Sequence, residues 1–191
     1  MGKLILLLGG ARSGKSVYAQ QKATELGGDR VLYVATSEAK DKEMHSRIEK
    51  HRAARPSSWL TLEALQDVGK AIRQANFNVG VILVDCITIL VSNRLQAAAG
   101  PQEDPFGNPS ADPFGAKIEV DIMFEVEKLV ACAREMDVVM IVVSNEVGMG
   151  LVPPYVLGRA YRDLLGRANQ ALARHADEVY LLVAGIPMRV K

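Results

Sequence analysis

Short apolar runs alternate with longer stretches of helical character along almost the whole chain, and this alternation constrains the fold more than any other feature. The apolar runs are Leu4–Leu8, Val31–Ala35, Val79–Val84, Val138–Val143 and Val179–Val183. Because they are apolar at nearly every position, they are typical of strands covered on both faces, as in a parallel sheet between helices. The helical stretches lie near residues 15–26, 38–54, 64–76, 86–98, 117–136 and 155–175. We therefore expect a three-layer α/β fold with a mostly parallel sheet, helices on both faces and right-handed crossovers.

Two further segments complete the expected sheet, and one interrupts the pattern. Trp59–Glu63 has the character of a short strand, and Gly185–Lys191 indicates a turn followed by a short antiparallel strand at the edge of the sheet. Between Gly100 and Gly115 the sequence PQEDPFGNPSADPFG contains four prolines, which continue neither a helix nor a strand. We expect an exposed loop at about residues 100–116 within a single domain spanning residues 1–191, rather than a boundary between two domains.

Charge and cysteine content argue against several classes of protein. With 23 Lys plus Arg against 22 Asp plus Glu, the net charge is +1, without the basic surplus typical of nucleic-acid binding. Cys86 and Cys132 stand in small apolar contexts without metal-binding spacing, which favours free thiols over a disulfide or a metal pair. The apolar run after Met1 is too short to span a membrane and has no secretory cleavage region. We therefore expect a cytoplasmic protein with no nucleic-acid partner and no integral membrane segment.

The residues that follow the first apolar run form a phosphate-binding motif. The sequence GGARSGKS matches the pattern GxxxxGK[ST] in full and comprises Gly9, Gly10, Ala11, Arg12, Ser13, Gly14, Lys15 and Ser16. A strand precedes it and a helix follows it, so backbone N–H groups and the helix N-terminus can surround a phosphate chain. Lys15 is expected to reach the β- and γ-phosphates, and the Ser16 hydroxyl to bind Mg²⁺. The alternative is a plain glycine-rich turn between strand and helix.

An acidic residue ends a second apolar run and complements this motif. Asp85 follows Val81–Val84, and an acid at the end of a buried strand can hold magnesium through water beside a phosphate loop. Its alternative role is a helix cap. The two features indicate a nucleotide-binding protein, but they do not distinguish a kinase, a switch GTPase, a transport ATPase or a recombinase-type motor.

A polar helical segment, residues 36–56, carries histidine and arginine side chains. At about 100° per residue, Ile48, His51 and Arg55 fall on one stripe of this helix, whereas His45 projects more than a quarter-turn away. Nearby positive charge disfavours protonation of an imidazole. A neutral imidazole at position 51 can attack phosphorus, and the neighbouring cations can stabilise the phosphoryl centre. The alternative is a basic, solvated helix whose histidine has no chemical role.

Several motifs together resemble one known family. They are GGARSGKS at 9–16, YVATSEAKDKEMHSRIEKHRAARPSSW at 33–59, VDCIT at 84–88, SNEVGMGLVPP at 144–154 and ADEVYLLVAGIPMRVK at 176–191. In these blocks the chain is similar to the bifunctional adenosylcobinamide kinases and adenosylcobinamide-phosphate guanylyltransferases of cobalamin assembly. The resemblance covers nearly the whole chain, and the HRxxRPxxW and NEVGMGxVP blocks are far more specific than the phosphate loop.

The resemblance implies a P-loop core of the RecA-like type and two reactions. ATP or GTP, with Mg²⁺, phosphorylates the aminopropanol hydroxyl of adenosylcobinamide. A histidine then attacks the α-phosphate of GTP, releases pyrophosphate and passes GMP to adenosylcobinamide phosphate, which gives adenosyl-GDP-cobinamide. The family's guanylylated histidine corresponds to His51, with Lys15 as the other catalytic residue, and family members resemble a homotrimer.

The same resemblance implies further site residues. The nucleotide-binding set is expected to combine Gly9–Ser16 and Asp85 with Thr36, Ser37, Arg52, Arg55 and Glu63. Asn145 and Glu146 mark a possible substrate edge, because ligands of α/β sheets bind beyond the carboxyl ends of strands. Alternatively these two residues form a turn held by side-chain hydrogen bonds, and Arg52 and Arg55 pair with acids of their own helix.

Two alternative functions remain open at this stage. One is a guanylyltransferase without useful kinase activity, because the same residues serve both reactions. The other is a nucleotide-dependent regulator or nucleic-acid motor, which the near-neutral net charge disfavours. The proline-rich segment from Gly100 to Gly115 is longer than in familiar members, which leaves open how the corrinoid substrate is bound.

Overall fold

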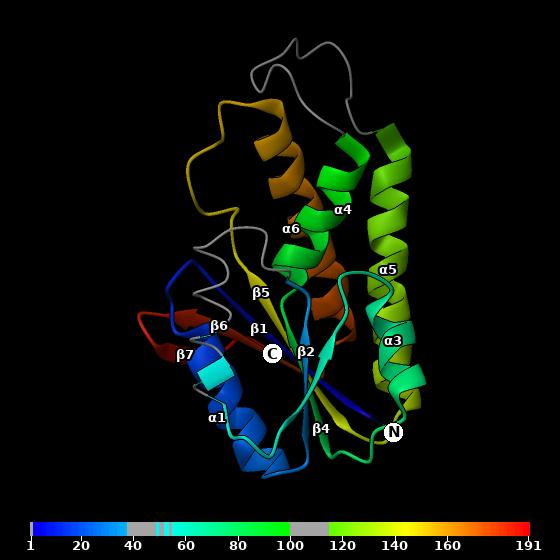
Figure 1. Ribbon diagram of the computed structural model, residues 1–191. Helices are drawn as coiled ribbons and strands as arrows, with labels where there is room; N and C mark the ends of the chain where they lie inside the picture. Colours follow the sequence, from blue (N-terminus) through cyan, green and yellow to red (C-terminus); the bar gives the residue numbers. More distant parts are fainter. Residues whose placement is uncertain (1, 38–48, 50–51, 54, 100–114) are drawn as a thin grey trace.

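A computed structural model of the chain describes residues 2–37, 49, 52–53, 55–99 and 115–191. The strands are β1 (Lys3–Gly9), β2 (Val31–Ala35), β3 (Leu60–Glu63), β4 (Val81–Asp85), β5 (Val139–Asn145), β6 (Glu178–Val183) and β7 (Ile186–Arg189). The helices are α1 (Lys15–Gly27), α3 (Val68–Ala75), α4 (Ile87–Ala99), α5 (Gly115–Glu135) and α6 (Val156–His175). Strands and helices alternate along most of the described chain, except that α5 follows α4 and β7 follows β6 (Figure 1).

The described strands form one seven-stranded sheet in the order β3-β2-β4-β5-β1-β6-β7. Neighbouring strands in this order run parallel except β6 and β7, which pair in antiparallel fashion with Val183 opposite Ile186. The predicted fold class, a mostly parallel α/β sheet with a short antiparallel edge at the C-terminus, is therefore confirmed. Strand β5 lies between β1, which leads into the phosphate loop, and β4, which ends in Asp85.

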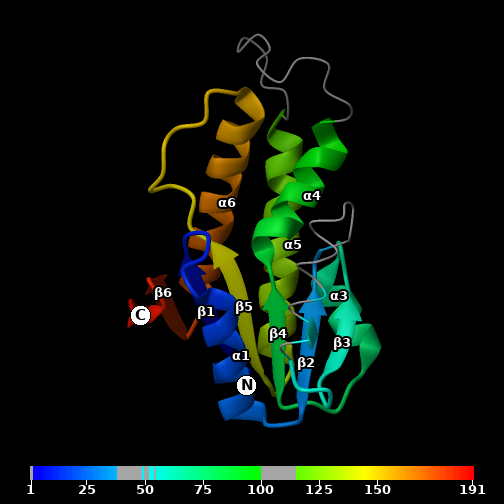
Figure 2. The same ribbon diagram turned by 60° about the vertical axis from the view of Figure 1, so that its left-hand side comes forward.

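Helices cover both faces of the sheet unequally. Alternate residues of β1 face opposite sides: Ile5 and Leu7 pack with residues of α1, whereas Leu4 and Leu6 pack against the layer formed by the other described helices. Each strand therefore needs apolar side chains at consecutive positions, which explains the nearly unbroken apolar runs. Helices α3, α4, α5 and α6 form the thicker layer, and α4, α5 and α6 extend beyond the carboxyl edge of the sheet (Figure 2).

Two helix boundaries differ from the sequence prediction. The helix expected near 64–76 begins only at Val68, because the Ala64 N–H donates to Ala35 O, 2.9 Å away, and Asp67 has a left-handed backbone with φ of 48°. Helix α5 begins at Gly115, so the expected loop ends earlier than residue 116. The rest of that loop and most of the expected 38–54 helix lie outside the described residues, although Glu49, Arg52 and Ala53 are helical.

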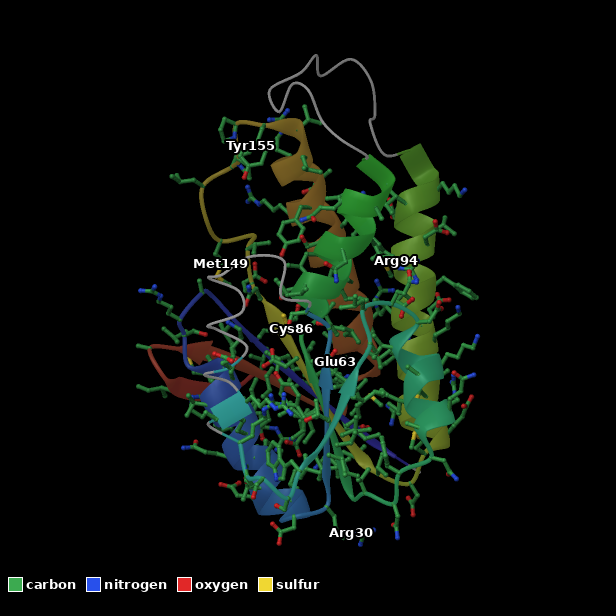
Figure 3. The ribbon with its side chains drawn as sticks, viewed as in Figure 1. Arg30, Glu63, Cys86, Arg94, Met149 and Tyr155 are labelled. Carbon is green, nitrogen blue, oxygen red and sulfur yellow. The ribbon has the colours of Figure 1, made fainter. Side chains whose placement is uncertain are left out.

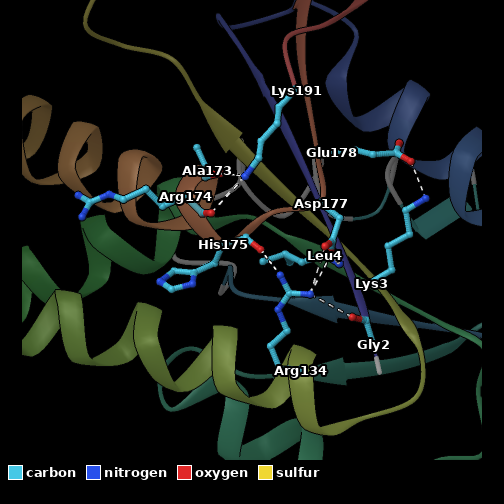
Figure 4. Close-up of polar contacts among 10 residues, drawn as sticks. All are labelled: Gly2, Lys3, Leu4, Arg134, Ala173, Arg174, His175, Asp177, Glu178 and Lys191. Carbon is cyan, nitrogen blue, oxygen red and sulfur yellow. Dashed lines mark hydrogen bonds and ion pairs between the residues drawn. The ribbon is translucent and has the colours of Figure 1, made fainter.

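A polar cluster joins the ends of several elements at the amino edge of the sheet (Figure 4). Arg134 of α5 donates to both carboxylate oxygens of Asp177, at 3.1 and 3.2 Å, and to His175 O at the end of α6, at 2.5 Å. Asp177 in turn accepts from Leu4 N at 2.7 Å. Burial alone would raise the pKa of Asp177, but these hydrogen bonds hold that pKa below its ordinary value. This cluster fixes the start of β1 against α5 and α6.

The structure bears on two further features of the chain, the state of its cysteines and the presence of membrane-spanning helices. Cys86 and Cys132 are both free thiols, as expected. In the part of the chain that the structure describes, no helix combines the length and the apolar character needed to cross a membrane.

Candidate active site

A cavity of about 620 Å³ opens at the carboxyl edge of the sheet. The phosphate loop forms one wall, and the ends of β2, β4 and β5 form the others. Its lining residues are Ala11, Arg12, Ser13, Gly14, Lys15, Ser16, Val17, Tyr33, Ala35, Ser37, Arg55, Asp85, Cys86, Ile89, Val143 and Asn145. A cavity of this volume falls in the range of small-molecule sites, which is about 300–1,000 Å³.

Glycine geometry shapes the phosphate loop. Gly14 has φ of 92°, a left-handed conformation that a side chain disfavours, and Arg12 also has a positive φ of 57°. Ser13 N–H donates to Gly10 O at 3.3 Å and closes the turn. Helix α1 begins directly afterwards at Lys15, so its free N-terminal N–H groups face the loop and favour a bound anion.

The turn between β6 and β7 supports this loop from behind. Gly185 N–H donates to Ser13 O at 2.9 Å. A Cβ atom at position 14 would lie 3.0 Å from Gly185 Cα, so the two backbones are in close contact. The antiparallel hairpin at the C-terminus therefore fixes the phosphate loop in addition to completing the sheet.

Lys15 is directed into the loop. Its side chain is buried, and Nζ donates to Gly10 O at 2.5 Å and to Ser13 Oγ at 3.4 Å. Burial lowers the pKa of Lys15, while the acidic groups of Cys86 and Asp85 act in the opposite direction. A phosphate oxygen held in the loop can replace these neutral acceptors with a charged one, which favours anion binding.

Three side chains form the wall opposite the phosphate loop. The Tyr33 hydroxyl donates to Asp85 Oδ2 at 3.1 Å, and the Arg55 guanidinium carbon lies 3.7 Å from the centre of the Tyr33 ring. Burial, followed by the charge of Asp85, raises the pKa of Tyr33 well above its ordinary value, so its hydroxyl stays protonated. Burial also lowers the pKa of Arg55, and Asp85 is among the groups that oppose this shift.

Cys86 follows Asp85 and also lines the cavity (Figure 3). Burial and the neighbouring Asp85 raise the pKa of this thiol to about 11. The thiol therefore stays protonated at neutral pH and is a poor nucleophile.

Asn145 lies at the end of β5, between the phosphate loop and Asp85 in the strand order. Two buried side chains hold its peptide groups: Asn145 N–H donates to Thr88 Oγ1 at 2.7 Å, and Asn169 Nδ2 donates to Asn145 O at 3.0 Å. Glu146 instead folds back on its own turn, where Oε1 accepts from Gly148 N at 2.6 Å. Glu146 therefore lies in a turn that its own side chain holds, which was one of the two alternatives for this pair. Asn145 instead lines the cavity.

The cavity brings together most of the residues that the sequence predicts for the nucleotide site. Those that line it are Ala11, Arg12, Ser13, Gly14, Lys15, Ser16, Ser37, Arg55 and Asp85, and Asn145, predicted as a possible substrate edge, lines it as well. Gly9 and Gly10 contribute backbone to the loop behind this lining.

The remaining predicted site residues lie elsewhere or are not described. Thr36 is fully buried, and its hydroxyl bonds to the backbone O and N of Cys86 at 2.7 and 2.8 Å. Glu63 is exposed at the end of β3 (Figure 3), and Arg52 is exposed on its helical segment; neither lines the cavity. His51 lies outside the described residues.

Sequence reasoning missed Tyr33 as a site residue. Within the run Val31–Ala35 it is one more apolar-looking position of a buried strand, and nothing in its immediate sequence indicates contact with Asp85, 52 positions away. One available signal was its place two residues before the end of β2, where parallel strands present side chains to a ligand.

The phosphate loop, its helix and the acid at the end of β4 define a phosphate-loop nucleotide-binding protein of the α/β class. More particularly, the chain belongs to the family described as cobinamide kinase / cobinamide phosphate guanyltransferase, whose model matches residues 5–190. It is therefore an enzyme of a family that combines kinase and guanylyltransferase activities.

Similar proteins match over almost their whole length. The bifunctional adenosylcobalamin biosynthesis protein CobU of Escherichia coli is 41% identical over 191 residues, covering 98% of this chain and 99% of that protein. CobU of Salmonella typhimurium is 40% identical over 190 residues, with the same coverage of both chains. CobP of Pseudomonas aeruginosa is 39% identical over 186 residues, covering 97% of this chain and 96% of that protein. A crystal structure of a KaiC-like protein from Pyrococcus horikoshii matches 94% of this chain and 70% of its own, with 19% identity and a TM-score of 0.49.

Proposed function

We propose that this enzyme carries out two successive reactions of cobalamin assembly in one cavity. It phosphorylates the aminopropanol hydroxyl of adenosylcobinamide with ATP or GTP, and then transfers GMP from GTP to the new phosphate, giving adenosyl-GDP-cobinamide and pyrophosphate. The observation that carries this proposal is the single cavity that joins the phosphate loop to Arg55, Asp85 and Asn145.

In the kinase step, the cavity positions the nucleoside triphosphate for attack by the substrate hydroxyl. The hydroxyl oxygen bonds to the γ-phosphorus, the bond from that phosphorus to the β–γ bridging oxygen breaks, and the hydroxyl proton passes to water. Lys15 and the backbone N–H groups of the loop stabilise the charge on the transferred group and on the departing diphosphate.

Mg²⁺ fits the donors that the cavity presents. Ser16 supplies a hydroxyl and Asp85 a carboxylate, and both line the same cavity as Lys15. Magnesium in phosphate sites prefers oxygen ligands and is bound through one or two carboxylates, waters and the substrate phosphates. When bound, the ion would neutralise phosphate charge during either transfer.

In the guanylyl step, His51 is the proposed nucleophile. Its imidazole nitrogen bonds to the α-phosphorus of GTP, and the bond to the α–β bridging oxygen breaks, so that pyrophosphate leaves. An oxygen of adenosylcobinamide phosphate then bonds to the same phosphorus and releases the histidine. Arg55 lines the cavity four positions after His51 in the sequence, which supports a role for its cation beside the phosphates.

Covalent labelling with α-³²P-GTP and Mg²⁺ tests this proposal. The parent protein should give an acid-labile, alkali-stable adduct, and His51→Ala should give none while still phosphorylating adenosylcobinamide. His45→Ala, which removes the histidine that the helical pattern places on another face, serves as the matched control and should label normally. Labelling of His51→Ala at the parent level would contradict the proposed intermediate.

We also propose that the enzyme is a cytoplasmic homotrimer whose corrinoid substrate binds beside Asn145. Light scattering on the purified protein tests the trimer, and a monomer at working concentration would contradict it. These features rest on the family resemblance.

A further inference from the structure

Tyr33 contacts both charged side chains on the wall of the cavity that faces the phosphate loop. It lies in the middle of β2, between Leu83 of β4 and Thr61 of β3, and its side chain is 5% exposed. A phenylalanine would fill the same apolar space between β2 and the α1 layer. Packing alone therefore explains neither the Tyr33 hydroxyl nor the place of the ring beside Arg55.

The hydroxyl contact orients Asp85. The Tyr33 O–H donates to Oδ2 of Asp85 at 3.1 Å. A carboxylate side chain at the end of a strand can rotate between several orientations, and a fixed donor on one oxygen selects among them.

The ring contact orients Arg55. The guanidinium lies over the ring face, 3.7 Å from its centre, at the distance of a stacked cation–π pair. The backbone just beyond Arg55 is fixed separately, because the buried Trp59 donates from Nε1 to Gly28 O at 3.1 Å and from its N–H to Pro56 O at 3.1 Å. With the backbone held at Trp59, the Tyr33 ring is one contact that positions the guanidinium.

We propose that Tyr33 is a positioning residue with two separable roles: its hydroxyl holds Asp85 in the orientation that serves Mg²⁺, and its ring holds Arg55 against the cavity that receives the nucleotide phosphates. The inference rests on the proposed function, because it assumes that this cavity binds a magnesium–nucleotide complex. Neither role requires Tyr33 to contact the substrate.

Calorimetric titration with GTP in its α,β-methylene form, which cannot transfer GMP to His51, separates the two roles when it is run with Mg²⁺ and with EDTA in its place. Tyr33→Phe keeps the ring and removes the hydroxyl, so affinity in EDTA should match the parent within twofold, while the gain in affinity from Mg²⁺ should fall by about tenfold. Tyr33→Leu removes the ring as well, so affinity in EDTA should also fall, by about three- to tenfold. Arg55→Ala should also lower affinity in EDTA, and the loss in the double variant with Tyr33→Leu should be smaller than the sum of the two single losses.

Tyr180→Phe is the matched control. Its hydroxyl also donates to a carboxylate, Glu178 Oε2 at 2.7 Å, but Tyr180 does not line the cavity. It should bind GTP as the parent does under both conditions. A melting temperature is measured for each variant, and the Tyr33→Phe comparison stands even if Tyr33→Leu folds poorly.

The outcomes distinguish this inference from the proposed function. If the parent binds GTP and Tyr33→Phe retains the full magnesium effect, the hydroxyl role is overturned. If Tyr33→Leu binds in EDTA as tightly as the parent, the ring role is overturned and Tyr33 is a core aromatic residue. If the parent itself does not bind GTP, the proposed function fails together with this inference.

Discussion

At the scale of single residues, the position of Asn145 depends on neighbours that never touch the cavity. Thr88 and Asn169 are both buried, and each bonds to one backbone group of Asn145. The proposal that substrate binds beside Asn145 requires support of this kind, because small displacements of a contacting group reduce transition-state stabilisation more than binding.

Replacing Asn169 by leucine tests this support. The substitution leaves Asn145 O without its donor, and we expect kcat of the kinase reaction to fall about tenfold while KM for the nucleotide changes less than twofold. Stability should fall by about 1–3 kcal/mol, because an acceptor loses its buried donor. Steady-state kinetics and urea unfolding measure the two effects.

The matched control is Asn78→Leu. The Asn78 side chain lies just before β4, accepts from Arg30 at 2.8 Å and does not line the cavity. It should keep parental kcat. If both variants lose activity in proportion to stability, Asn169 is structural and does not position Asn145.

Single residues also show which parts of the site the sequence could predict and which parts it could not. Lys15, Ser16 and Asp85 follow from local motifs, because the phosphate loop and the acid after a strand are continuous in sequence. Tyr33 is a site residue through contacts with Asp85 and Arg55 that form only in the folded sheet. The hydroxyl of Thr36 bonds to the backbone of Cys86, another contact that the local sequence does not reveal.

At the scale of elements, one buried carboxylate joins three helices. Glu125 of α5 is 2% exposed; it accepts from Val68 N at the start of α3 and from Arg94 Nη2 of α4, each at 2.7 Å. The hydrogen bond from Val68 N–H to Glu125 acts together with the left-handed backbone of Asp67 to start α3 at Val68. The capping group lies 57 positions away in the sequence, so local signals could not reveal that start.

Glu125→Gln should destabilise the fold measurably. The amide keeps the size of the side chain but leaves the partly buried Arg94 without a countercharge, which should cost roughly 2–3 kcal/mol. The urea midpoint should fall without a change in m-value. Replacing both partners by apolar residues, Glu125→Leu with Arg94→Met, should recover part of this loss.

Glu127→Gln is the control for this change. Glu127 is exposed on the same helix, and its replacement should leave the free energy of unfolding within about 0.5 kcal/mol of the parent. An equally small effect of Glu125→Gln would show that the contacts of Glu125 do not stabilise α3 and α4.

At the scale of the whole molecule, the sheet separates a catalytic edge from a structural edge. The cavity opens at the carboxyl ends of β2, β4 and β5, whereas ion pairs gather at the amino edge around the starts of β1 and β6 (Figure 4). The sequence indicated which residues form strands, but not that β5 lies between β1 and β4. Strand order depends on how the helices cross the sheet, and no local pattern encodes that.

The amino edge should make stability sensitive to acid. Hydrogen bonds from Lys3 and Tyr180, with the charge of Lys22, lower the pKa of Glu178 from 4.5 to about 2. Because the folded-state pKa is the lower one, Glu178 contributes stability above pH 4.5 that is lost progressively as pH falls towards 2. Glu178→Gln should therefore lower the free energy of unfolding at pH 7, and the difference from the parent should shrink below pH 4.5 and vanish only below about pH 2.

Chemical denaturation across this pH range, with Glu127→Gln as the control, measures the effect. The parent and Glu178→Gln curves should converge towards low pH, whereas the control should run parallel to the parent. A constant difference between the parent and Glu178→Gln at every pH would mean that the contribution of Glu178 does not depend on its charge.

In the proposed function, one phosphate loop serves both phosphoryl and guanylyl transfer. The most direct test measures both activities of Lys15→Ala: phosphorylation of adenosylcobinamide and covalent labelling by α-³²P-GTP. We predict that both rates fall by about 10²–10³-fold, the usual effect of removing one group that stabilises transition-state charge. Parental labelling in a Lys15→Ala protein that has lost kinase activity would show that the two reactions take place in separate sites and would rule out a shared phosphate loop.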